Sequence, residues 1–543
     1  MRLASLTVAC FALPAFAQSV EESYQLLPND PSGGTAFGVS VAVNPLRQLV
    51  GAPSSNVAGE LSGAAYVYDT LSGRLLHSLV PEGKRAGARF GSAVDLGPGR
   101  AIVGAPTDDG EAPRSGSASI YDLTTGALQF RFTRSGGASD ELLGSAVAID
   151  GRFAAIGAPG VDGSGACYVL DVFSGALVHV LRPEDGAEGD EFGGSVALSG
   201  SRLVVGSRAA DPRGPDSGAA YVFDLESGHQ LALLVPSDGE AFDGFGSDVA
   251  IQGERVLVGA PYDGDEGEDS GSAYVFDAMD GAQIAKLRGS GTRAEDGFGA
   301  AVALDGELAL VGAPRADPSG KSSGTAYVFS TNTGVELGRL APTTASAQSE
   351  FGSAVALHGQ FAVVGAWQAP GRGGDAGTSY FFELQSLTPS GSGSCYAYEV
   401  RCPCRSSAST SEGCPNSTGS GATLTGSGSS SLATGDFRLI GHGLPRGATS
   451  LLLRGSERMR GGASRPFGDG VLCLTGDVVQ AQVVRASSVG AVTVPCAPAS
   501  LAALSLSQGS SLAHYQLWYR DDGSSCTRNG LNSTNVWSLR WRP

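Results

Sequence analysis

The sequence is poor in several residue types, and each scarcity restricts the fold or the function. Lysine occurs only three times in 543 residues, and 36 basic residues stand against 54 acidic ones, which gives a formal net charge of −18. A chain this acidic does not hold the phosphate backbone of nucleic acid as its main task. Beyond residue 17 there is no run of 18 apolar residues, so no later segment is expected to span a membrane.

The sequence also lacks the short motifs that mark common catalytic sites. It has six histidines and contains no His-Glu-x-x-His, no Gly-x-Ser-x-Gly on a strand-to-helix turn and no P-loop. Paired carboxylates can hydrolyse glycosides without histidine, so a polysaccharide-acting enzyme stays open as an alternative. What the chain has in abundance is glycine, with 81 residues beside 41% hydrophobic residues, and this favours a turn-dense β protein.

The N-terminus has the pattern of a secretory signal peptide over residues 1–17. Arg2 supplies a positive charge, Leu3 to Pro14 is a short apolar stretch, and Ala15-Phe16-Ala17 fits a small-x-small cleavage site. We therefore expect an exported protein, secreted or held at the cell surface, in an oxidising environment.

A repeat organises most of the chain. A Phe-Gly pair (Leu-Gly in the third copy) begins each unit, and a second glycine, usually in Gly-Ala-Pro, follows thirteen residues later. The first glycines are Gly38, Gly91, Gly144, Gly193, Gly246, Gly299 and Gly352, and the second are Gly51, Gly104, Gly157, Gly206, Gly259, Gly312 and Gly365. The period is 53 residues, with one unit of 49, which is typical of a fixed scaffold with one adjustable loop.

Each unit contains four runs that read as strands. In the fifth unit these are Phe245 to Ile251, Arg255 to Gly259, Ser272 to Asp277 and Ile284 to Leu287. The runs are apolar or small on both faces, as in sheets covered on both sides. Seven four-stranded units predict an all-β, seven-bladed β-propeller, with a β-solenoid as the competing fold.

The two ends of the repeat region predict how the ring closes. The seventh unit has only three runs, the last being Thr378 to Leu384, whereas Tyr24 to Pro28 looks like an isolated fourth strand. Pairing this N-terminal strand with the last unit would complete the seventh blade and remove the open edges.

The spaced Phe-Gly and Gly-Ala-Pro units resemble the FG-GAP repeat family, best known from the propeller of integrin α subunits. The resemblance covers residues 22–385. It implies a seven-bladed propeller that binds proteins or glycans outside the cell, often with calcium. The calcium loops of that family lie between the first and second strands. Here that connection is a tight turn such as Asp305-Gly306-Glu307, so those sites are not carried over.

Carboxylates instead gather in the two long connections, which strand alternation places on one face of the ring. We call this the long-loop face: the loops after Gly-Ala-Pro together with the loops before Phe-Gly. Closely spaced carboxylates among glycines suit calcium, so calcium is the candidate cofactor. The candidate metal ligands are Asp263, Asp265, Asp269, Asp185, Asp190, Asp238 and Asp243. The alternative is that these residues only solvate the surface and cap turns.

A different composition begins after the propeller. Residues 386–394 read as a linker, and residues 395–543 form a cysteine-containing module of short strands, predicted to be a small β-sandwich. The module resembles one appended to many secreted bacterial repeat proteins, through Cys402-Pro403-Cys404 and Leu517-Trp518-Tyr519-Arg520, and this implies no known chemistry.

Two hypotheses remain for the cysteines of this module. Zinc bound by Cys395, Cys402, Cys404 and Cys414 is one, and disulfides are favoured by export. Cys167, in the third blade, takes the place of a small residue and is expected to be a buried free thiol.

Together these patterns indicate an exported, non-enzymatic binding or adhesion protein whose partner is an extracellular protein or glycan. One alternative is a structural component of the cell envelope. Residues 391–543 carry 13 arginines against 8 acidic residues, so this basic module would attach the protein to the envelope. The other alternative is the polysaccharide-acting enzyme.

Overall fold

The computed structural model describes residues 18–28, 34–83, 85–344, 346–371 and 376–384, and a set of separate strands and short stretches between residues 392 and 540. The predicted signal peptide lies outside the described residues. So do the cysteines on which the zinc and disulfide hypotheses rest, which are Cys395, Cys402, Cys404, Cys414, Cys473, Cys496 and Cys526.

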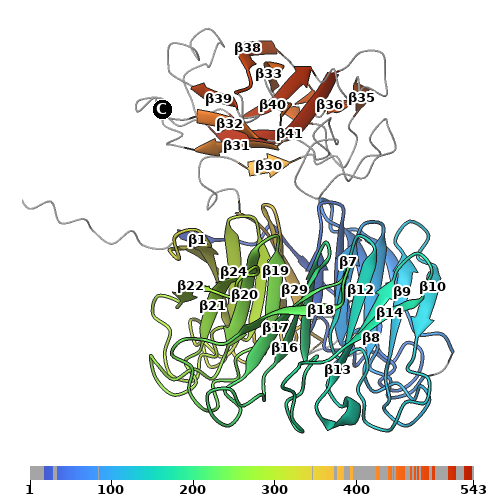
Figure 1. The fold of residues 1–543 in the computed structure, drawn as a ribbon. Helices are drawn as coiled ribbons and strands as arrows, with labels where there is room; N and C mark the ends of the chain where they lie inside the picture. Colours follow the sequence, from blue (N-terminus) through green and yellow to red (C-terminus); the bar gives the residue numbers. More distant parts are fainter. Residues whose placement is uncertain are drawn as a thin grey trace, which may run out of the picture.

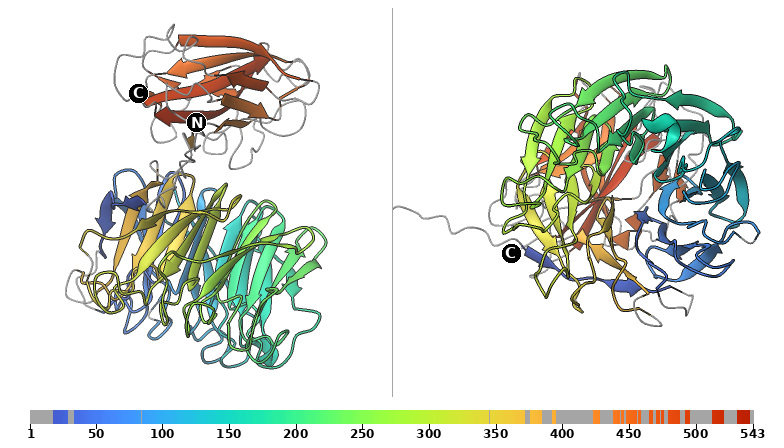
Figure 2. Two further views of the ribbon diagram at one scale, coloured as in Figure 1. Left: turned by 90° about the vertical axis from the view of Figure 1, so that its left-hand side faces the viewer. Right: turned by 90° about the horizontal axis from the view of Figure 1, so that it is seen from below.

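Seven sheets stand side by side around a ring, and each contains four antiparallel strands (Figures 1 and 2). The prediction of a seven-bladed propeller is confirmed, and the solenoid is ruled out. Blade one has β3 (Val41–Val43), β4 (Arg47–Ala52), β5 (Ala64–Asp69) and β6 (Leu75–Leu79). Blade two has β7 (Ala93–Gly97), β8 (Arg100–Ala105), β9 (Ser117–Asp122) and β10 (Leu128–Phe132). Blade three has β11 (Val147–Asp150), β12 (Phe153–Ala158), β13 (Ala166–Asp171) and β14 (Leu177–Leu181), with the short 3-10 turn η1 (Val161–Gly163) in its long loop.

The remaining blades follow the same order. Blade four has β15 (Ser195–Ser199), β16 (Arg202–Ser207), β17 (Ala219–Asp224) and β18 (His229–Leu234). Blade five has β19 (Val249–Gln252), β20 (Arg255–Ala260), β21 (Ser272–Asp277) and β22 (Gln283–Leu287). Blade six has β23 (Ala301–Asp305), β24 (Leu308–Ala313), β25 (Thr325–Ser330) and β26 (Glu336–Leu340). Blade seven has β27 (Ala354–His358), β28 (Phe361–Ala366) and β29 (Thr378–Glu383), completed by β2 (Tyr24–Leu26).

The ring closes as the sequence predicts. β2 pairs antiparallel with β29, and Tyr24 stands opposite Phe381 with their rings stacked 4.7 Å apart. Leu26 is buried in the same contact between blades seven and one.

One strand was not expected from the sequence. β1 (Gln18–Val20) pairs in parallel with β26 and becomes a fifth strand at the outer edge of blade six. The N-terminal segment therefore contacts two neighbouring blades.

The regular glycines lie where neighbouring blades touch. A Cβ atom on Gly259, at the end of β20, would lie 2.0 Å from the carbonyl oxygen of Gly299 in the next blade. A Cβ on Gly271 would lie 2.0 Å from the carbonyl oxygen of Phe298. Atoms cannot approach so closely, so only glycine lets these backbones meet. The same contact joins Gly365 to Gly38 and closes the ring.

The predicted start of the first strand is wrong by several residues. In blade five the strand β19 begins at Val249, and Phe245 lies in the preceding segment, where it forms a single parallel bridge with Gly218 of blade four. Its fully buried ring packs edge-on against Tyr274 and Phe276, at 5.6 and 5.7 Å. The phenylalanine of each Phe-Gly pair is thus a wedge between strands and not part of a ladder.

Cys167 is confirmed as a buried free thiol, and burial raises its pKa to about 12. No helix in the described part of the chain is long and apolar enough to cross a membrane.

Most of the described residues of the C-terminal part form β-strands. One sheet has the order β30-β41-β40-β33-β38 and a second has the order β31-β32-β39. Two further pairs are β34 with β37 and β35 with β36. The bounds are β30 (Ser392–Ser394), β31 (Thr423–Ser427), β32 (Arg438–His442), β33 (Thr449–Gly455), β34 (Glu457–Arg458), β35 (Arg465–Phe467), β36 (Gly470–Leu472), β37 (Leu474–Thr475), β38 (Val479–Arg485), β39 (Val492–Pro495), β40 (Leu512–Arg520) and β41 (Leu531–Arg540).

The glycine contact between blades yields a direct test. Gly259→Ala is expected to destabilise the protein by about 1–3 kcal/mol, because the added methyl group forces two backbones apart. Gly264→Ala is the matched control, since a Cβ there has no neighbour closer than 4.0 Å. Urea unfolding measures both variants, and equal stability of the two would contradict this account of the repeat.

Candidate functional site

The long loops share one face of the propeller, which points downward in Figure 1. The chain leaves the ring after β29, at the opposite face, where the short turns lie. The carboxylates predicted as metal ligands are all on the long-loop face, in blades three to five and their connections.

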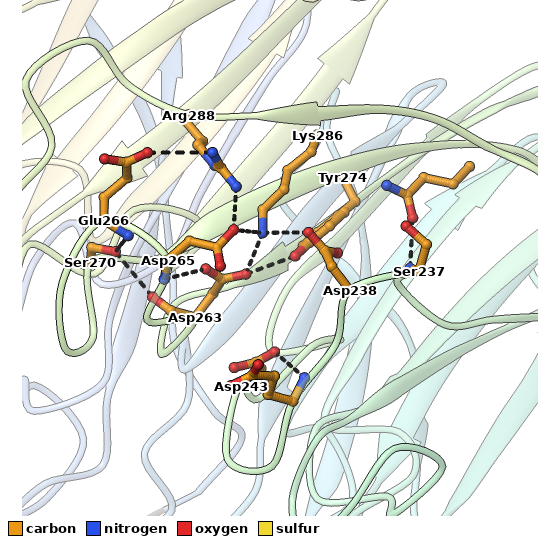
Figure 3. Close-up of polar contacts among 12 residues, drawn as sticks. Ser237, Asp238, Asp243, Asp263, Asp265, Glu266, Ser270, Tyr274, Lys286 and Arg288 are labelled. Atoms are coloured by element: carbon orange, nitrogen blue, oxygen red, sulfur yellow. Dashed lines mark hydrogen bonds and ion pairs between the residues drawn. The ribbon is translucent and has the colours of Figure 1, made fainter.

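Three of these carboxylates converge on a lysine ammonium group, as Figure 3 shows. The Nζ atom of Lys286, on β22, lies 2.9 Å from Asp238, 2.8 Å from Asp263 and 2.6 Å from Asp265. Arg288 adds a second cation by pairing with Asp265 and, at 3.3 Å, with Glu266. Three of the seven acids predicted as calcium ligands therefore surround a protein cation.

Burial makes this cluster stiff. The side chain of Asp263 is only 4% exposed and that of Lys286 is 12% exposed. Burial alone would raise the pKa of Asp263, but hydrogen bonds from Lys286 and from the Tyr274 hydroxyl, at 2.7 Å, hold it below its usual value. Burial alone would lower the pKa of Lys286, and its carboxylate partners raise it instead. Both groups stay charged and tie the long loop of blade five to strand β22.

The repeats show that the pair is a replaceable packing element. Asp108 and Arg131 occupy the same two positions in blade two and lie 2.6 Å apart. Three other blades have neutral residues at both positions, namely Ser55 with Ser78, Val161 with Val180, and Ala210 with Leu233. The acid therefore occurs only where its base is present, as expected when a buried charge needs its partner. Blade six has the base alone: Arg339 stands with Ala316 and pairs with Glu336 at 3.0 Å.

Asp190 and Asp243 close turns in the loops between blades. Each carboxylate accepts a hydrogen bond of 2.7 Å from the N–H group three residues earlier, at Ala187 and Glu240 respectively. The pKa of Asp243 is raised to about 6, mainly by burial, and the negative charge of the Asp263 carboxylate acts in the same direction.

Asp269 and Asp185 lie apart from the lysine cluster. Asp269 has a left-handed backbone with φ of +53°, and its carboxylate is 4.0 Å from Arg315. Asp185 lies close enough to Tyr221 to influence its hydroxyl group: the pKa of Tyr221 is raised mainly by burial and, to a smaller extent, by the negative charge of Asp185.

No group of three or more His, Cys, Asp or Glu side chains in the described residues is arranged to hold a metal ion. Because Lys286 supplies the positive charge among Asp238, Asp263 and Asp265, the arrangement of these three carboxylates does not fit calcium. The calcium hypothesis gains no support from this geometry and stays a prediction.

Sequence reasoning missed a more unusual residue in the loop that holds Asp238 and Asp243. Phe242, between blades four and five, has a left-handed backbone with φ of +70° and is 62% exposed. The equivalent positions are left-handed in all seven repeats and are occupied by Gly34, Gly87, Asp140, Gly189, Phe242, Glu295 and Gln348. Comparing this column of the repeats would have singled out Phe242 as the one aromatic residue.

Large side chains occur within or directly after the Gly-Ala-Pro segments of blades four to seven, namely Arg208, Tyr262, Arg315, Trp367 and Gln368. In blades one to three the same positions hold Pro with Ser, Thr or Gly. Together with Glu191 and Glu350, which precede the Phe-Gly pairs of blades four and seven, we call this group the collar.

Contacts fix the collar side chains in place. Arg208 bonds to Glu191 at 2.6 Å, and Arg315 lies over the ring of Tyr262 at 5.6 Å. Trp367 donates to Glu350 at 2.9 Å.

Two carboxylates inside the ring also escaped the sequence analysis. Asp95 on β7 and Asp248 in blade five each accept a 2.7 Å hydrogen bond from the next blade, from the N–H groups of Ile149 and Val302. Burial raises the pKa of Asp95 to about 6 and that of Asp248 to about 7. They join neighbouring inner strands.

Comparison with protein-family models gives the classification. The FG-GAP repeat model matches residues 20–68, 76–121, 128–170, 177–223, 229–276, 282–329 and 335–382. These segments cover more than half of the chain, which therefore belongs to the FG-GAP repeat family, as an integrin-α-like propeller. A comparison with curated proteins gives no match.

The matched segments also explain the closure of the ring. Each begins at the outer strand of one blade and ends at the third strand of the next, so every unit is shared by two blades. A propeller built in this way supports a binding or structural role, and repeats of this family typically occur in extracellular or surface proteins.

Removing the central cation tests the lysine cluster. Lys286→Met is expected to cost about 3 kcal/mol of unfolding free energy, because it leaves the buried Asp263 charge without its partner. Adding Asp263→Asn should restore most of that loss. Asp238→Asn, at a carboxylate that is 40% exposed, should cost less than about 1 kcal/mol. A Lys286→Met variant as stable as the wild type in urea would refute the scaffold role.

The raised pKa of Asp243 predicts a pH dependence. The folded protein binds this proton more tightly than the unfolded chain does, so the group's contribution to stability is present at about pH 4 and is lost as the pH rises through about 6. Asp243→Asn keeps an oxygen for the Glu240 N–H group and does not titrate. Relative to wild type, the variant should gain stability on going from about pH 4 to about pH 7.5. A stability difference independent of pH would show that Asp243 has an ordinary pKa.

Proposed function

We propose that this protein is an exported, non-catalytic binding protein that contacts an extracellular protein or glycan with its long-loop face, centred on the junction of blades four and five. Export is supported by the signal-peptide pattern and by the family to which the chain belongs. The proposed contact does not depend on calcium, because Asp263 and Asp265 at this junction are paired with Lys286 and Arg288.

Phe242 is the observation that carries the proposal. A left-handed backbone costs a residue with a Cβ atom about 1–2 kcal/mol, and Phe lacks the local hydrogen bonds that ease this cost for Asn and Asp. The ring is 62% exposed, so burial in the propeller offsets little of that strain. Glycine serves at the same position in three repeats, so the fold does not need the aromatic ring. A strained and exposed aromatic residue is best explained by a contact with a partner.

The rest of the junction suits such a contact. The lysine cluster holds the neighbouring loops rigid. Tyr262 contacts the loop that carries Phe242, because its backbone N–H group donates to the carbonyl oxygen of Asp243 at 3.3 Å and its ring lies against Gly244. A rigid platform loses little entropy on binding.

A single substitution separates binding from folding. Phe242→Gly should raise the unfolding free energy by about 1 kcal/mol, because glycine accepts the left-handed backbone, and it should lower partner capture at least about tenfold. The full-length protein is immobilised and exposed to the extracellular fraction of producing cells, and the captured protein and carbohydrate are quantified.

Asp140→Gly is the matched control, since it relieves a left-handed backbone at the junction of blades two and three. Its capture should equal that of wild type. If Phe242→Gly captures as much material as wild type, the long-loop junction is not the binding site.

A further inference from the structure

The collar has a composition that indicates what kind of partner it takes. It has two aromatic side chains at the surface, Tyr262, which is 38% exposed, and Trp367, which is half-buried. They add to Phe242, which is on the same face but outside the collar. Tyr262 belongs to blade five and Trp367 to blade seven, and Arg315 of blade six stands between them in the order of the ring. Aromatic rings of this kind offer flat apolar surfaces with a polar edge.

Two glycines make room for these side chains. A Cβ on Gly244 would lie 2.8 Å from the ring of Tyr262, and a Cβ on Gly297 would lie 2.9 Å from the guanidinium group of Arg315. The equivalent residues in blades four and seven are Glu191 and Glu350. Glycine therefore occurs in the two blades where a large collar side chain lies down on the backbone.

The charges of the collar are balanced locally. Glu191 pairs with Arg208, and Asp269 is 4.0 Å from Arg315. Both oxygens of Glu350 accept hydrogen bonds, from Trp367 at 2.9 Å and from Gln368 at 2.5 Å. The collar thus offers donors and acceptors side by side without a surplus of positive charge. An anionic polymer would meet this balanced patch on an acidic face and would be repelled.

From these observations we infer that the collar binds a neutral polysaccharide, whose sugar rings stack on Tyr262 and Trp367 while their hydroxyl groups exchange hydrogen bonds with the paired charged side chains. This inference rests on the proposed function, because it assigns a ligand class to the same face. Uncharged sugars have apolar ring faces and many hydroxyl groups, and they match aromatic surfaces bordered by paired donors and acceptors.

The test uses the full-length protein and four immobilised neutral polysaccharides: dextran, mannan, laminarin and arabinogalactan. Alginate and polylysine serve as the charged comparators. At least one neutral polymer should bind, and its Kd should change less than about twofold between about 50 mM and about 500 mM NaCl, since screening acts on charged contacts. Tyr262→Ala and Trp367→Ala should each weaken binding at least about tenfold.

Phe173→Ala is the control, because Phe173 is as exposed as Phe242, at 63%, and lies in a short turn on the opposite face. It should bind like wild type. Thermal unfolding of each variant shows whether it is folded, and the second aromatic substitution decides the matter if the first one unfolds.

Three results would overturn the inference: no neutral polymer binds, both aromatic variants bind as wild type does, or only a charged polymer binds and high salt abolishes the binding. If Phe242→Gly still loses partner capture while no neutral polymer binds, the partner is a different molecule. The ligand assignment then fails, and the proposed binding face is retained.

Discussion

The propeller depends on the close approach of glycine backbones between neighbouring blades. A Cβ atom on the glycine of Gly-Ala-Pro would meet the carbonyl oxygen of the next Phe-Gly glycine at about 2 Å in every blade, including the closing contact of Gly365 with Gly38. Because this contact fixes how near two blades stand, it sets the packing of the phenylalanine wedges and the width of the ring. The loops vary in length and sequence only outside this glycine contact.

This dependence explains how much could be predicted. A steric requirement at fixed intervals leaves a fixed pattern of glycines, so the number of blades, the strand order and the closure by β2 were visible in the sequence. The start of the first strand was not visible, because the apolar residues of Phe245 to Ile251 suit a wedge as well as a ladder. β1 escaped prediction because three residues carry no periodic signal.

The candidate site was harder to predict for a different physical reason. A carboxylate gives the same sequence signal whether it binds a cation, caps a turn or pairs with a base from another strand. Lys286 is 23 residues from Asp263 in the chain, and only the folded blade brings them together. Phe242 and the collar were found in a different way: their side chains differ from those at the equivalent positions of the other repeats, where smaller residues are sufficient for folding. In a repeat protein, residues that differ from their equivalents in the other repeats and do not stabilise the fold are the ones to examine for function.

The arrangement of β1 and β2 also determines how the propeller responds to force. Tyr24 and Phe381 stand at the same edge of the closing pair, near the points where the chain enters and leaves the blade. A pull on the two ends of the ring would therefore part β2 from β29 one hydrogen bond at a time, which is the weak direction for a hairpin. β1 lies between that pair and the N-terminus, bonded to blade six. A pull on the N-terminus therefore has to part β1 from blade six before it reaches the closing pair of β2 and β29.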